Sequence, residues 1–468
     1  MRLPTPRVSA LLVLVFLGFG TLLGSAAGSG SGRLAADVSP RLKLLVPAGA
    51  AASGAKASTE GAAEAPAAQP ESTPEAAGES PSTTPTKTST SKSSEPESES
   101  ESEGSAEKKE SEEHGAGRQG STAKPATTLP AFKHVFLIVL SDEPYAADFG
   151  PESKARYLAG TLERKGELLL RYDAVAHEQL ANEIALVSGQ GPTAQTAANC
   201  PVYAPLTPAG LGADGQALDS GCVYPAATPT LGGQLAAAHL TWKAYIQGID
   251  EPGTAAGACA HPAAGATDPT VASGPYATFR DPFVYFESVV SSGSCASEIV
   301  GLSSLSGDLA SGGGTPSLSY IVPDRCHDAG PTACSPGAAS GPADADGFLE
   351  SVVPRILASK AYRAGGLLVI TSDEAPSSGE FSDSSSCCGQ PAYPNLAPVE
   401  GHGRGGGAVG ALLISPRVPA GRTSSEPYNH FSLLRTIEDT FGLSHLGFAG
   451  LGAVKPLAPA LFSASAKG

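Results

Sequence analysis

One stretch constrains the fold of this chain more than any other: residues 365–377, GGLLVITSDEAPS, where an apolar run ends at two adjacent carboxylates. The residues from Leu367 to Thr371 show no alternation of apolar and polar side chains, which predicts a strand buried on both faces, as in a parallel sheet. Asp373 and Glu374 would then lie at the carboxyl end of that strand. Open α/β sheets bind ligands at this edge, so we expect the functional site there.

Apolar runs alternate with segments of helical periodicity through residues 129–468. We expect strands at 132–140, 241–246, 318–322, 367–371 and 408–414, and helices at 180–189, 231–238, 346–364 and 432–443. Pro354 should kink the third of these helices, and Gly442 should end the fourth. This alternation predicts an α/β domain with a doubly wound, mostly parallel sheet and helices on both faces.

The first 128 residues are expected to lie outside this domain. Residues 1–28 combine two arginines, an apolar run and small residues, the order of a secretory signal peptide, with an uncleaved N-terminal membrane anchor as the alternative. Residues 29–128 are mostly Ala, Pro, Ser, Thr, Glu and Lys, so we expect a disordered linker, either a tether or a tolerated low-complexity tail. Residues 129–468 should therefore fold outside the cytoplasm, secreted or tethered to the membrane.

The cysteines and the net charge limit which environments and partners are expected for this chain. The eight cysteines of an exported chain favour disulfides, and we expect the local pairs Cys200–Cys222 and Cys326–Cys334. The adjacent residues Cys387 and Cys388 are expected to bond to two different partners. The formal net charge of −16 argues against nucleic acid as a partner, because phosphate contacts need clustered Lys and Arg. It is compatible with a cation-binding site.

Several common catalytic motifs do not occur in the sequence. There is no GxSxG, Walker A or HExxH sequence, and the GxGxxG match at 405–410 precedes an expected strand where a dinucleotide site must follow one. What remains is a set of acids and histidines at expected strand ends and in loops: Asp142, Glu143, His327, Asp328, Asp373, Glu374, His402 and His430. Such groups can hold divalent cations, which activate nucleophiles and stabilise phosphoryl transition states. Taken alone, each of these acids is more simply interpreted as an exposed loop residue. Asp373 and Glu374 are the exception, because they end a buried strand and the repulsion between their charges requires a partner charge.

Seven segments in order resemble the bacterial phosphoesterase family that contains phospholipases C and acid phosphatases, within the alkaline-phosphatase-like superfamily. They are HVFLIVLSDEPYAADFG, AHEQLANEIALVSGQ, TWKAYIQGI, DPFVYFESVV, LSYIVPDRCHD, VITSDEA and PYNHFSLLRTIEDTFGL. The resemblance implies an alkaline-phosphatase-like α/β fold. It also implies hydrolysis of phosphate esters, on a small molecule or a lipid head group, with a divalent metal ion.

The resemblance assigns roles to particular residues. The family's metal-binding Asp and its acidic neighbour fall on Asp373 and Glu374, and the histidine before the final helix falls on His430. The strand-end pair falls on His327 and Asp328, the latter a further expected metal ligand.

Other family positions are altered. The Glu-Asn motif after the first strand keeps only one good ligand, Asp142. The nucleophilic Ser or Thr of the HPSLPNY-type helix falls on Gln179, which cannot form a phospho-enzyme intermediate. Asn182 matches the family, whereas the His-Asn pair before Pro-Phe becomes Arg280-Asp281.

Three functions remain open at this point. The first is an extracytoplasmic, metal-dependent phosphoesterase in which Asp142, Asp373 and Glu374 hold the cation and Arg280 clamps the phosphate as a bidentate donor. His430 or His327 would handle protons or complete the metal shell. Water activated by the metal would attack the phosphate ester directly. The second is a catalytically degenerate relative that serves as a surface-tethered binding or structural domain. The third is an ordinary wall protein whose acids keep it soluble.

Overall fold

A computed structural model of the chain describes residues 128–207, 210–250, 257–272, 274–311, 313–331, 340–396 and 405–462. The expected signal peptide and linker lie outside these residues, apart from Thr128, and so do His402 and Cys334, the expected partner of Cys326. Within these ranges, no helix combines the length and apolar character needed to span a membrane.

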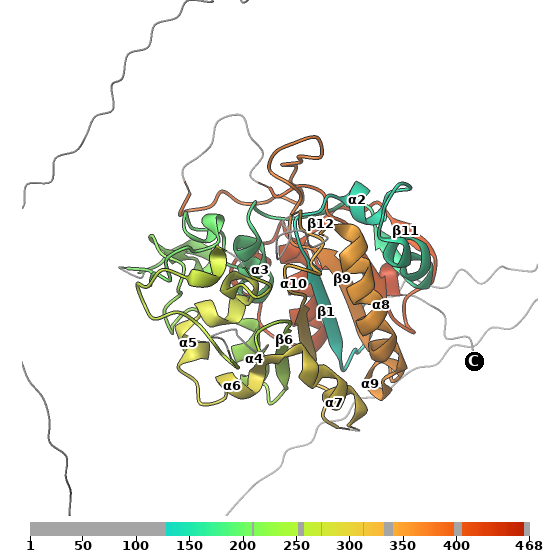
Figure 1. Ribbon diagram of the computed structural model, residues 1–468, viewed down its shortest axis with the longest axis horizontal. Coiled ribbons are helices and arrows are strands. Elements are labelled where there is room, and N and C mark those ends of the chain that lie inside the picture. The colour runs from blue at the N-terminus through green and yellow to red at the C-terminus, as the bar shows by residue number, and fades with distance from the viewer. Residues whose placement is uncertain are drawn as a thin grey trace, which may run out of the picture. The chain divides into compact units, whose positions relative to one another are not determined.

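The described chain is built around an eight-stranded sheet with the strand order β11-β2-β10-β9-β1-β8-β6-β7 (Figure 1). Its strands are β1 Val135–Leu140, β2 Glu167–Leu169, β6 Trp242–Ile246, β7 Ile299–Gly301, β8 Leu318–Val322, β9 Leu367–Ser372, β10 Ala411–Ile414 and β11 Arg422–Ser424. Neighbouring strands run parallel except β10, which is antiparallel to both β9 and β2. The expected mostly parallel sheet is confirmed.

Two small sheets accompany the large one. Strands β3 Tyr172–Asp173 and β12 Tyr428–Asn429 pair in parallel, and β4 Gly210–Leu211 and β5 Ala217–Leu218 pair antiparallel. The α-helices of the described residues are α2 Tyr145–Phe149, α3 Gln179–Ser188, α4 Leu231–Ala237, α5 Glu287–Val290, α6 Cys295–Glu298, α7 Leu305–Ala310, α8 Pro342–Ala358, α9 Lys360–Arg363 and α10 His430–Phe441. A π-helix, η1 Tyr157–Leu162, lies between α2 and β2.

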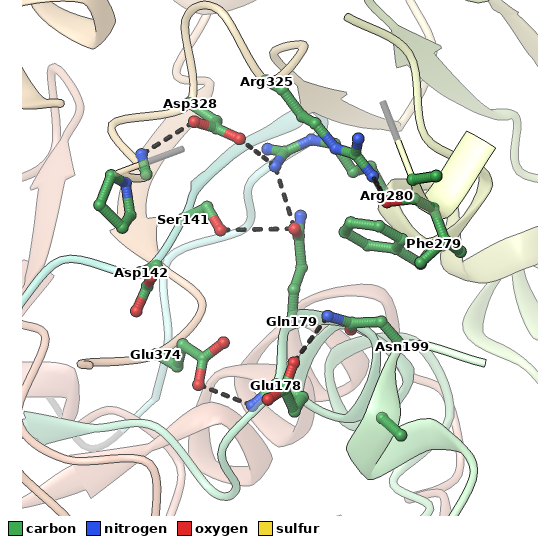
Figure 2. Close-up of a pocket in the computed structure, with 15 residues that line it drawn as sticks. Ser141, Asp142, Glu178, Gln179, Asn199, Phe279, Arg280, Arg325, Asp328 and Glu374 are labelled. Carbon is green, nitrogen blue, oxygen red and sulfur yellow. Dashed lines mark hydrogen bonds and ion pairs between the residues drawn. The ribbon is translucent and has the colours of Figure 1, made fainter. Parts of the chain in front are cut away.

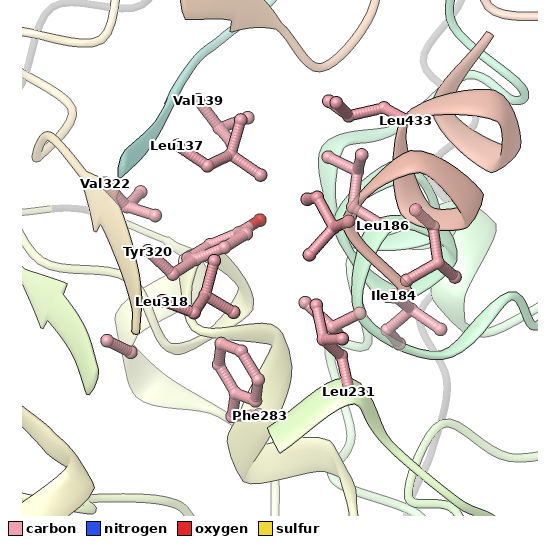
Figure 3. Packing of buried hydrophobic residues seen from close by; sticks show 14 of the residues in the cluster. Leu137, Val139, Ile184, Leu186, Leu231, Phe283, Leu318, Tyr320, Val322 and Leu433 are labelled. Carbon is pink, nitrogen blue, oxygen red and sulfur yellow. The ribbon is translucent and has the colours of Figure 1, made fainter. Parts of the chain in front are cut away.

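Strand β1 shows that helices cover both faces of the sheet. Successive side chains of a strand point to opposite faces. Leu137 and Val139 belong to one buried cluster with side chains of α3, α4 and α10, whereas Phe136 and Ile138 belong to another with side chains of α7 and α8. Figure 3 shows the first cluster, in which Leu137 and Val139 face the helices that carry Ile184 and Leu433. Burying one such side chain contributes about 1.5–3 kcal/mol, so the two clusters hold the sheet between its helices.

Local signals set the helix ends. Helix α3 ends at Gly189 and α10 at Gly442, whose φ angles of 68° and 67° lie in the left-handed region that glycine adopts readily. The side chain of Asn429 accepts a hydrogen bond from the N–H of Ser432 and caps the start of α10. The helix expected at 346–364 is divided at Ser359 into α8 and α9, and Pro354 lies within α8.

The disulfides correct one expectation. Cys200–Cys222 is a disulfide, as expected, and Cys259–Cys295 is another. Cys387 and Cys388 bond to each other, so the expectation that they reach two different partners is wrong. A tight turn explains the pairing, because Cys388 has a φ of 67° and the N–H of Gln390 donates to the carbonyl of Cys387.

Candidate active site

Three adjacent strands, β9, β1 and β8, end at the same edge of the sheet, because β1 is parallel to both of its neighbours. Asp142 lies just after β1, Asp373 and Glu374 follow β9, and Asp328 lies in the loop after β8. The sheet therefore brings to one edge acids that lie far apart in the sequence, such as Asp142 and Asp373, which are separated by 231 residues.

A pocket of about 400 Å³ opens at this edge. Residues predicted for the site that line it are Asp142, Gln179, Arg280, Asp328 and Glu374. Figure 2 shows Asp142 and Glu374 on one side of the pocket and Arg280 and Arg325 on the other, with Gln179 between them. Negative and positive side chains thus face the same space.

Asp142 and Asp373 are joined through the backbone of Asp142. The N–H of Asp142, whose φ of 49° is in the left-handed region, donates to Oδ1 of Asp373 over 3.0 Å. The other carboxylate oxygen of Asp373, Oδ2, is buried and has no hydrogen-bond partner in the described protein. A buried charged oxygen without a partner is costly, so this group requires a proton or a cation.

The carboxyl groups on this side of the pocket have raised pKa values. Burial, followed by the charge of Glu178, raises the pKa of Asp142 to about 6. The pKa values of Asp373 and Glu374 are raised well above their ordinary range, first by burial and then by a neighbouring carboxylate, Glu374 for the former and Asp142 for the latter. A bound cation would compensate these like charges.

Glu374 connects the pocket to a histidine that the sequence reasoning missed. Its Oε2 accepts a hydrogen bond from the N–H of Glu178 over 2.6 Å and lies 3.4 Å from Nδ1 of His177. Nε2 of His177 lies 2.8 Å from Oγ of Ser384. A signal was present, since His177 is the second residue of the segment AHEQLANEIALVSGQ, which resembles the HPSLPNY-type helix.

Arg280 is a buried cation of the pocket, with 1% of its surface exposed. Its Nε donates to the carbonyl of Pro323 over 2.8 Å, and its Nη1 donates to Gln179 and forms an ion pair with Asp328. The second oxygen of Asp328 accepts from the N–H of Gly330 over 2.8 Å. Nη2 of Arg280 is buried without a hydrogen-bond partner in the described chain, so its capacity to donate is not satisfied there.

Gln179 begins α3 at the position where the family resemblance places the nucleophile. Its side-chain nitrogen donates to Oε1 of Glu183 over 2.6 Å. Its carbonyl oxygen accepts from Oγ of Ser141 over 3.3 Å and from Nη1 of Arg280 over 3.0 Å. Glu183 also accepts a hydrogen bond from the hydroxyl of Tyr320 over 3.0 Å. An amide has no nucleophilic hydroxyl, so no covalent phosphoryl intermediate can form at this residue.

Arg325 adds a second cation that the sequence reasoning did not select, although it belongs to the PDRCHD segment after β8. Its Nη2 donates to the carbonyls of Thr270 and Val271, both over 2.9 Å, and its guanidinium carbon lies 5.0 Å from the ring centre of Phe279. Burial, together with the nearby charge of Arg280, lowers the pKa of Arg325. Because Val271 and Phe279 also line the pocket, this wall combines positive charge with apolar surface.

His430 lies behind the pocket, not in its lining. It is fully buried at the start of α10, where Nε2 donates to the carbonyl oxygen of Asp373 over 2.8 Å and Nδ1 accepts from the hydroxyl of Tyr172 over 2.9 Å. Burial lowers the pKa of His430 to about 4, so the ring is neutral at pH 7. Both ring nitrogens are thus engaged, and the histidine supports the backbone of Asp373.

His327 and Asn182 also lie outside the pocket lining. Nδ1 of His327 lies 2.6 Å from Oδ1 of Asp324, and this hydrogen bond is the main cause that raises the pKa of His327. Oδ1 of Asn182 accepts from the N–H groups of Val175 and Ala176 over 2.9 and 3.0 Å. Asn182 therefore fixes the loop that leads into α3.

The acids after β1 and β9 suit a metal ion because of their charge and burial, not because their ligand atoms are already gathered around one point. One group of three metal-binding side chains with ligand atoms within 4.8 Å occurs in the described ranges: Asp324, Cys326 and His327. Cys326 is disulfide-bonded, so its sulfur is not a thiolate ligand. The acids after β1 and β9 are not gathered this closely, but their raised pKa values and the unpartnered Oδ2 of Asp373 suit a cation.

Known proteins are similar to this chain in sequence or in structure. The model of the phosphoesterase family matches residues 156–444. A solved protein of the alkaline phosphatase superfamily from Vibrio parahaemolyticus is 14% identical, with 71% of this chain and 72% of that chain covered and a TM-score of 0.40. A phosphonate monoester hydrolase from Silicibacter pomeroyi is 11% identical, with 72% and 78% covered and a TM-score of 0.41.

A lipoteichoic acid synthase from Listeria monocytogenes is 10% identical, with 71% of this chain and 77% of that chain covered and a TM-score of 0.39. Structural likenesses this distant carry no argument about activity. No curated protein matches the sequence.

Proposed function

This chain belongs to the phosphoesterase family, as its sequence led us to expect, and from that premise we propose that it hydrolyses phosphate esters with the help of a divalent cation. The observation that supports this most is the pocket with Asp142 and Glu374 on one side and Arg280 and Arg325 on the other. Carboxylates bind cations, and guanidinium groups bind phosphate oxygens. The two requirements of metal-assisted hydrolysis therefore meet in one pocket.

The phosphate group binds against the arginines. Nη2 of Arg280 is buried and unpartnered, so it is the donor most in need of an anion. Arg325 contributes a second positive charge beside it. The alcohol part of the ester packs on the apolar side chains of Val271 and Phe279. This wall favours substrates with an apolar or aromatic group next to the phosphate.

The cation is held by Asp142, Asp373 and Glu374. When bound, it supplies positive charge to the phosphate oxygens and lowers the pKa of a bound water. Asp373 is kept in place by the N–H of Asp142 on its side chain and by His430 on its carbonyl oxygen. Asp328 is committed to Arg280 through their buried ion pair.

Water is the nucleophile, because Gln179 has no hydroxyl group. The hydroxyl of Ser141 lies in the same pocket, but it donates to the carbonyl of Gln179, and an amide cannot take its proton. Of the two histidines expected to handle protons, both ring nitrogens of His430 are engaged and His327 lies outside the pocket lining, so we assign neither a proton-transfer role.

We place this reaction outside the cytoplasm. The disulfides Cys200–Cys222, Cys259–Cys295 and Cys387–Cys388 support an oxidising environment. Export by residues 1–28, as a cleaved signal or as a membrane anchor, is part of the same proposal. The substrate is then an extracellular phosphate ester, either a small molecule or a lipid head group.

A second function has one specific observation in its favour. Gln179 is held at both ends, by Glu183 on its nitrogen and by Ser141 and Arg280 on its oxygen. A site whose nucleophile position is filled and fixed in this way suits a binding domain that holds a phosphate ester without turning it over.

Turnover of a small ester panel distinguishes these two functions. The full-length chain is supplied with Mg²⁺, Mn²⁺, Zn²⁺ or Ca²⁺ and assayed on an aryl phosphate monoester, an aryl phosphodiester and an aryl sulfate, with a chelator as the control. Release of the aryl alcohol from a phosphate ester, abolished by the chelator, supports the hydrolase. Binding of the esters without release under every condition supports the binding domain instead.

A further inference from the structure

The side-chain oxygen of Gln179 lies where hydrogen-bond donors converge. Oγ of Ser141 and Nη1 of Arg280 both donate to it, over 3.3 and 3.0 Å. A hydroxyl and a guanidinium are the donors with which proteins hold the oxygens of phosphate groups. Nη2 of the same guanidinium is buried and unpartnered in the described chain, so one more acceptor is missing beside it. The donors form an oxyanion site in which the protein's own oxygen fills one position.

Glu183 fixes the orientation of this amide from behind. The nitrogen of Gln179 donates to Oε1 of Glu183 over 2.6 Å. Turning the amide over would place its NH₂ group against the donors of Ser141 and Arg280 and its oxygen against the carboxyl of Glu183. Burial raises the pKa of Glu183 well above its ordinary range, and Oε1 can accept a hydrogen bond in either protonation state. The carbonyl oxygen is therefore held toward the pocket.

The helix that carries Gln179 adds to the attraction for an anion. Gln179 is the first residue of α3, a helix of 10 residues, and both it and the preceding Glu178 line the pocket. The N-terminal end of such a helix favours negative charge, because its first N–H groups lack partners within the helix. The N-terminal end of α3 and Arg280 thus line the same pocket.

We propose that Gln179 is an internal plug, whose Oε1 occupies the position of a phosphate oxygen between Ser141 and Arg280. A phosphate group must displace this oxygen to bind there, so the native chain binds free phosphate weakly. Shortening the side chain at position 179 exposes the donors and opens the site. The inference rests on the proposed function only for the identity of the anion.

Binding of inorganic phosphate tests the plug without any need for turnover. Isothermal titration calorimetry in the presence of Mg²⁺ compares the native full-length chain with Gln179→Ala. The substitution frees Nη1 of Arg280 from the oxygen of Gln179, and this charged donor should lower the Kd for phosphate by about tenfold. The matched control is Gln234→Ala, a glutamine outside the pocket that donates to the carbonyl of Ser444, and it should bind as the native chain does. An unchanged Kd in a folded Gln179→Ala variant overturns the proposal.

Two further variants locate the effect. Gln179→Ala combined with Arg280→Lys keeps the charge that pairs with Asp328 but removes the planar fork of donors, so the gain in affinity should disappear. A gain that survives this change places the anion elsewhere and overturns the proposal. Gln179→Asn retains an amide near Glu183 and withdraws the oxygen by one methylene group, so it serves if Gln179→Ala does not fold. It should give a smaller gain, and no gain overturns the plug.

The plug and the hydrolase can fail separately. A chain that hydrolyses phosphate esters, but whose phosphate affinity is the same with and without Gln179, contradicts the plug and leaves the proposed function standing. A chain that gains phosphate affinity on Gln179→Ala, but shows no turnover with any cation, supports the plug and contradicts the hydrolase.

Discussion

The N–H of Asp142 donates to Oδ1 of Asp373 over 3.0 Å, and this contact joins the ends of β1 and β9 at the candidate site. The contact satisfies one oxygen of Asp373 and leaves Oδ2 buried without a partner in the described chain. Because burial and Glu374 both disfavour the charged form of Asp373, the free protein holds this group at an energetic cost that a bound cation removes.

Breaking the buried ion pair should destabilise the fold strongly. Arg280→Met leaves the carboxylate of Asp328 buried without its cation, so we expect a loss of about 3–5 kcal/mol in the free energy of unfolding. Arg280→Lys keeps the charge and should cost less. Urea denaturation followed by circular dichroism measures both. Equal stability of Arg280→Met and the native chain would show that the pair is not an essential buried contact.

Removing the His430 ring should weaken the support of Asp373. His430→Phe fills a similar volume but leaves the hydroxyl of Tyr172 and the carbonyl of Asp373 unsatisfied, at a cost of about 1–3 kcal/mol for each buried group. His445→Phe, at a histidine paired with Asp439 near the surface, is the control and should change stability little. Thermal unfolding of the two variants gives the comparison. A larger loss in His445→Phe would contradict the role of His430.

Asp148 should make the protein less stable as the pH rises. Burial raises its folded-state pKa from 3.8 to about 7, so the folded state binds a proton that the unfolded state has lost between these values. Its stabilising contribution is fully present below pH 3.8 and is lost as the pH rises through about 7, by a few kcal/mol in total. Asp148→Asn should therefore flatten the fall in stability with pH, as measured by urea denaturation. An identical pH dependence in the variant would contradict this.

The two adjacent cysteines should be found bonded to each other. Proteolysis of the non-reduced protein should yield one peptide that contains both Cys387 and Cys388 and carries their internal disulfide, with no second chain attached. Mass spectrometry before and after reduction identifies it. A peptide linked through either cysteine to another part of the chain would restore the expectation made from the sequence.

The sheet could be predicted because its strands are uninterrupted apolar runs. All residues of β9, Leu367–Ser372, are buried, and the sequence predicted this strand to within one residue. The strands β2 Glu167–Leu169 and β11 Arg422–Ser424 were not predicted, because three residues are too few to show a period. The pairing of Cys387 with Cys388 depends on a local turn that composition does not reveal.

The sequence predicted where the site lies, at the carboxyl edge of the sheet, but not which side chains line it. Carboxyl ends of parallel strands meet at one edge, which is why Asp142 and Asp373 were expected near each other. Which side chains line the pocket depends on how the backbone leaves each strand: Glu374 lines it, whereas its neighbour Asp373 is fully buried beside Asp142. His430 matches the family by position yet lies behind the pocket, and Arg325 lines it without having been selected. Such details require the packing of segments distant in the sequence.

The measurement that tests the central claim most directly compares bound divalent metal and phosphate-ester turnover in the native chain and in Asp373→Asn. Asparagine retains an acceptor for the N–H of Asp142 but removes the charge, and Asp439→Asn, near the surface, is the matched control. We predict that the native chain and Asp439→Asn bind the cation and turn over the ester. Asp373→Asn should lose the cation and at least about 100-fold of the turnover rate. Native chain that binds no cation and hydrolyses no ester, or turnover that survives Asp373→Asn, would contradict the account.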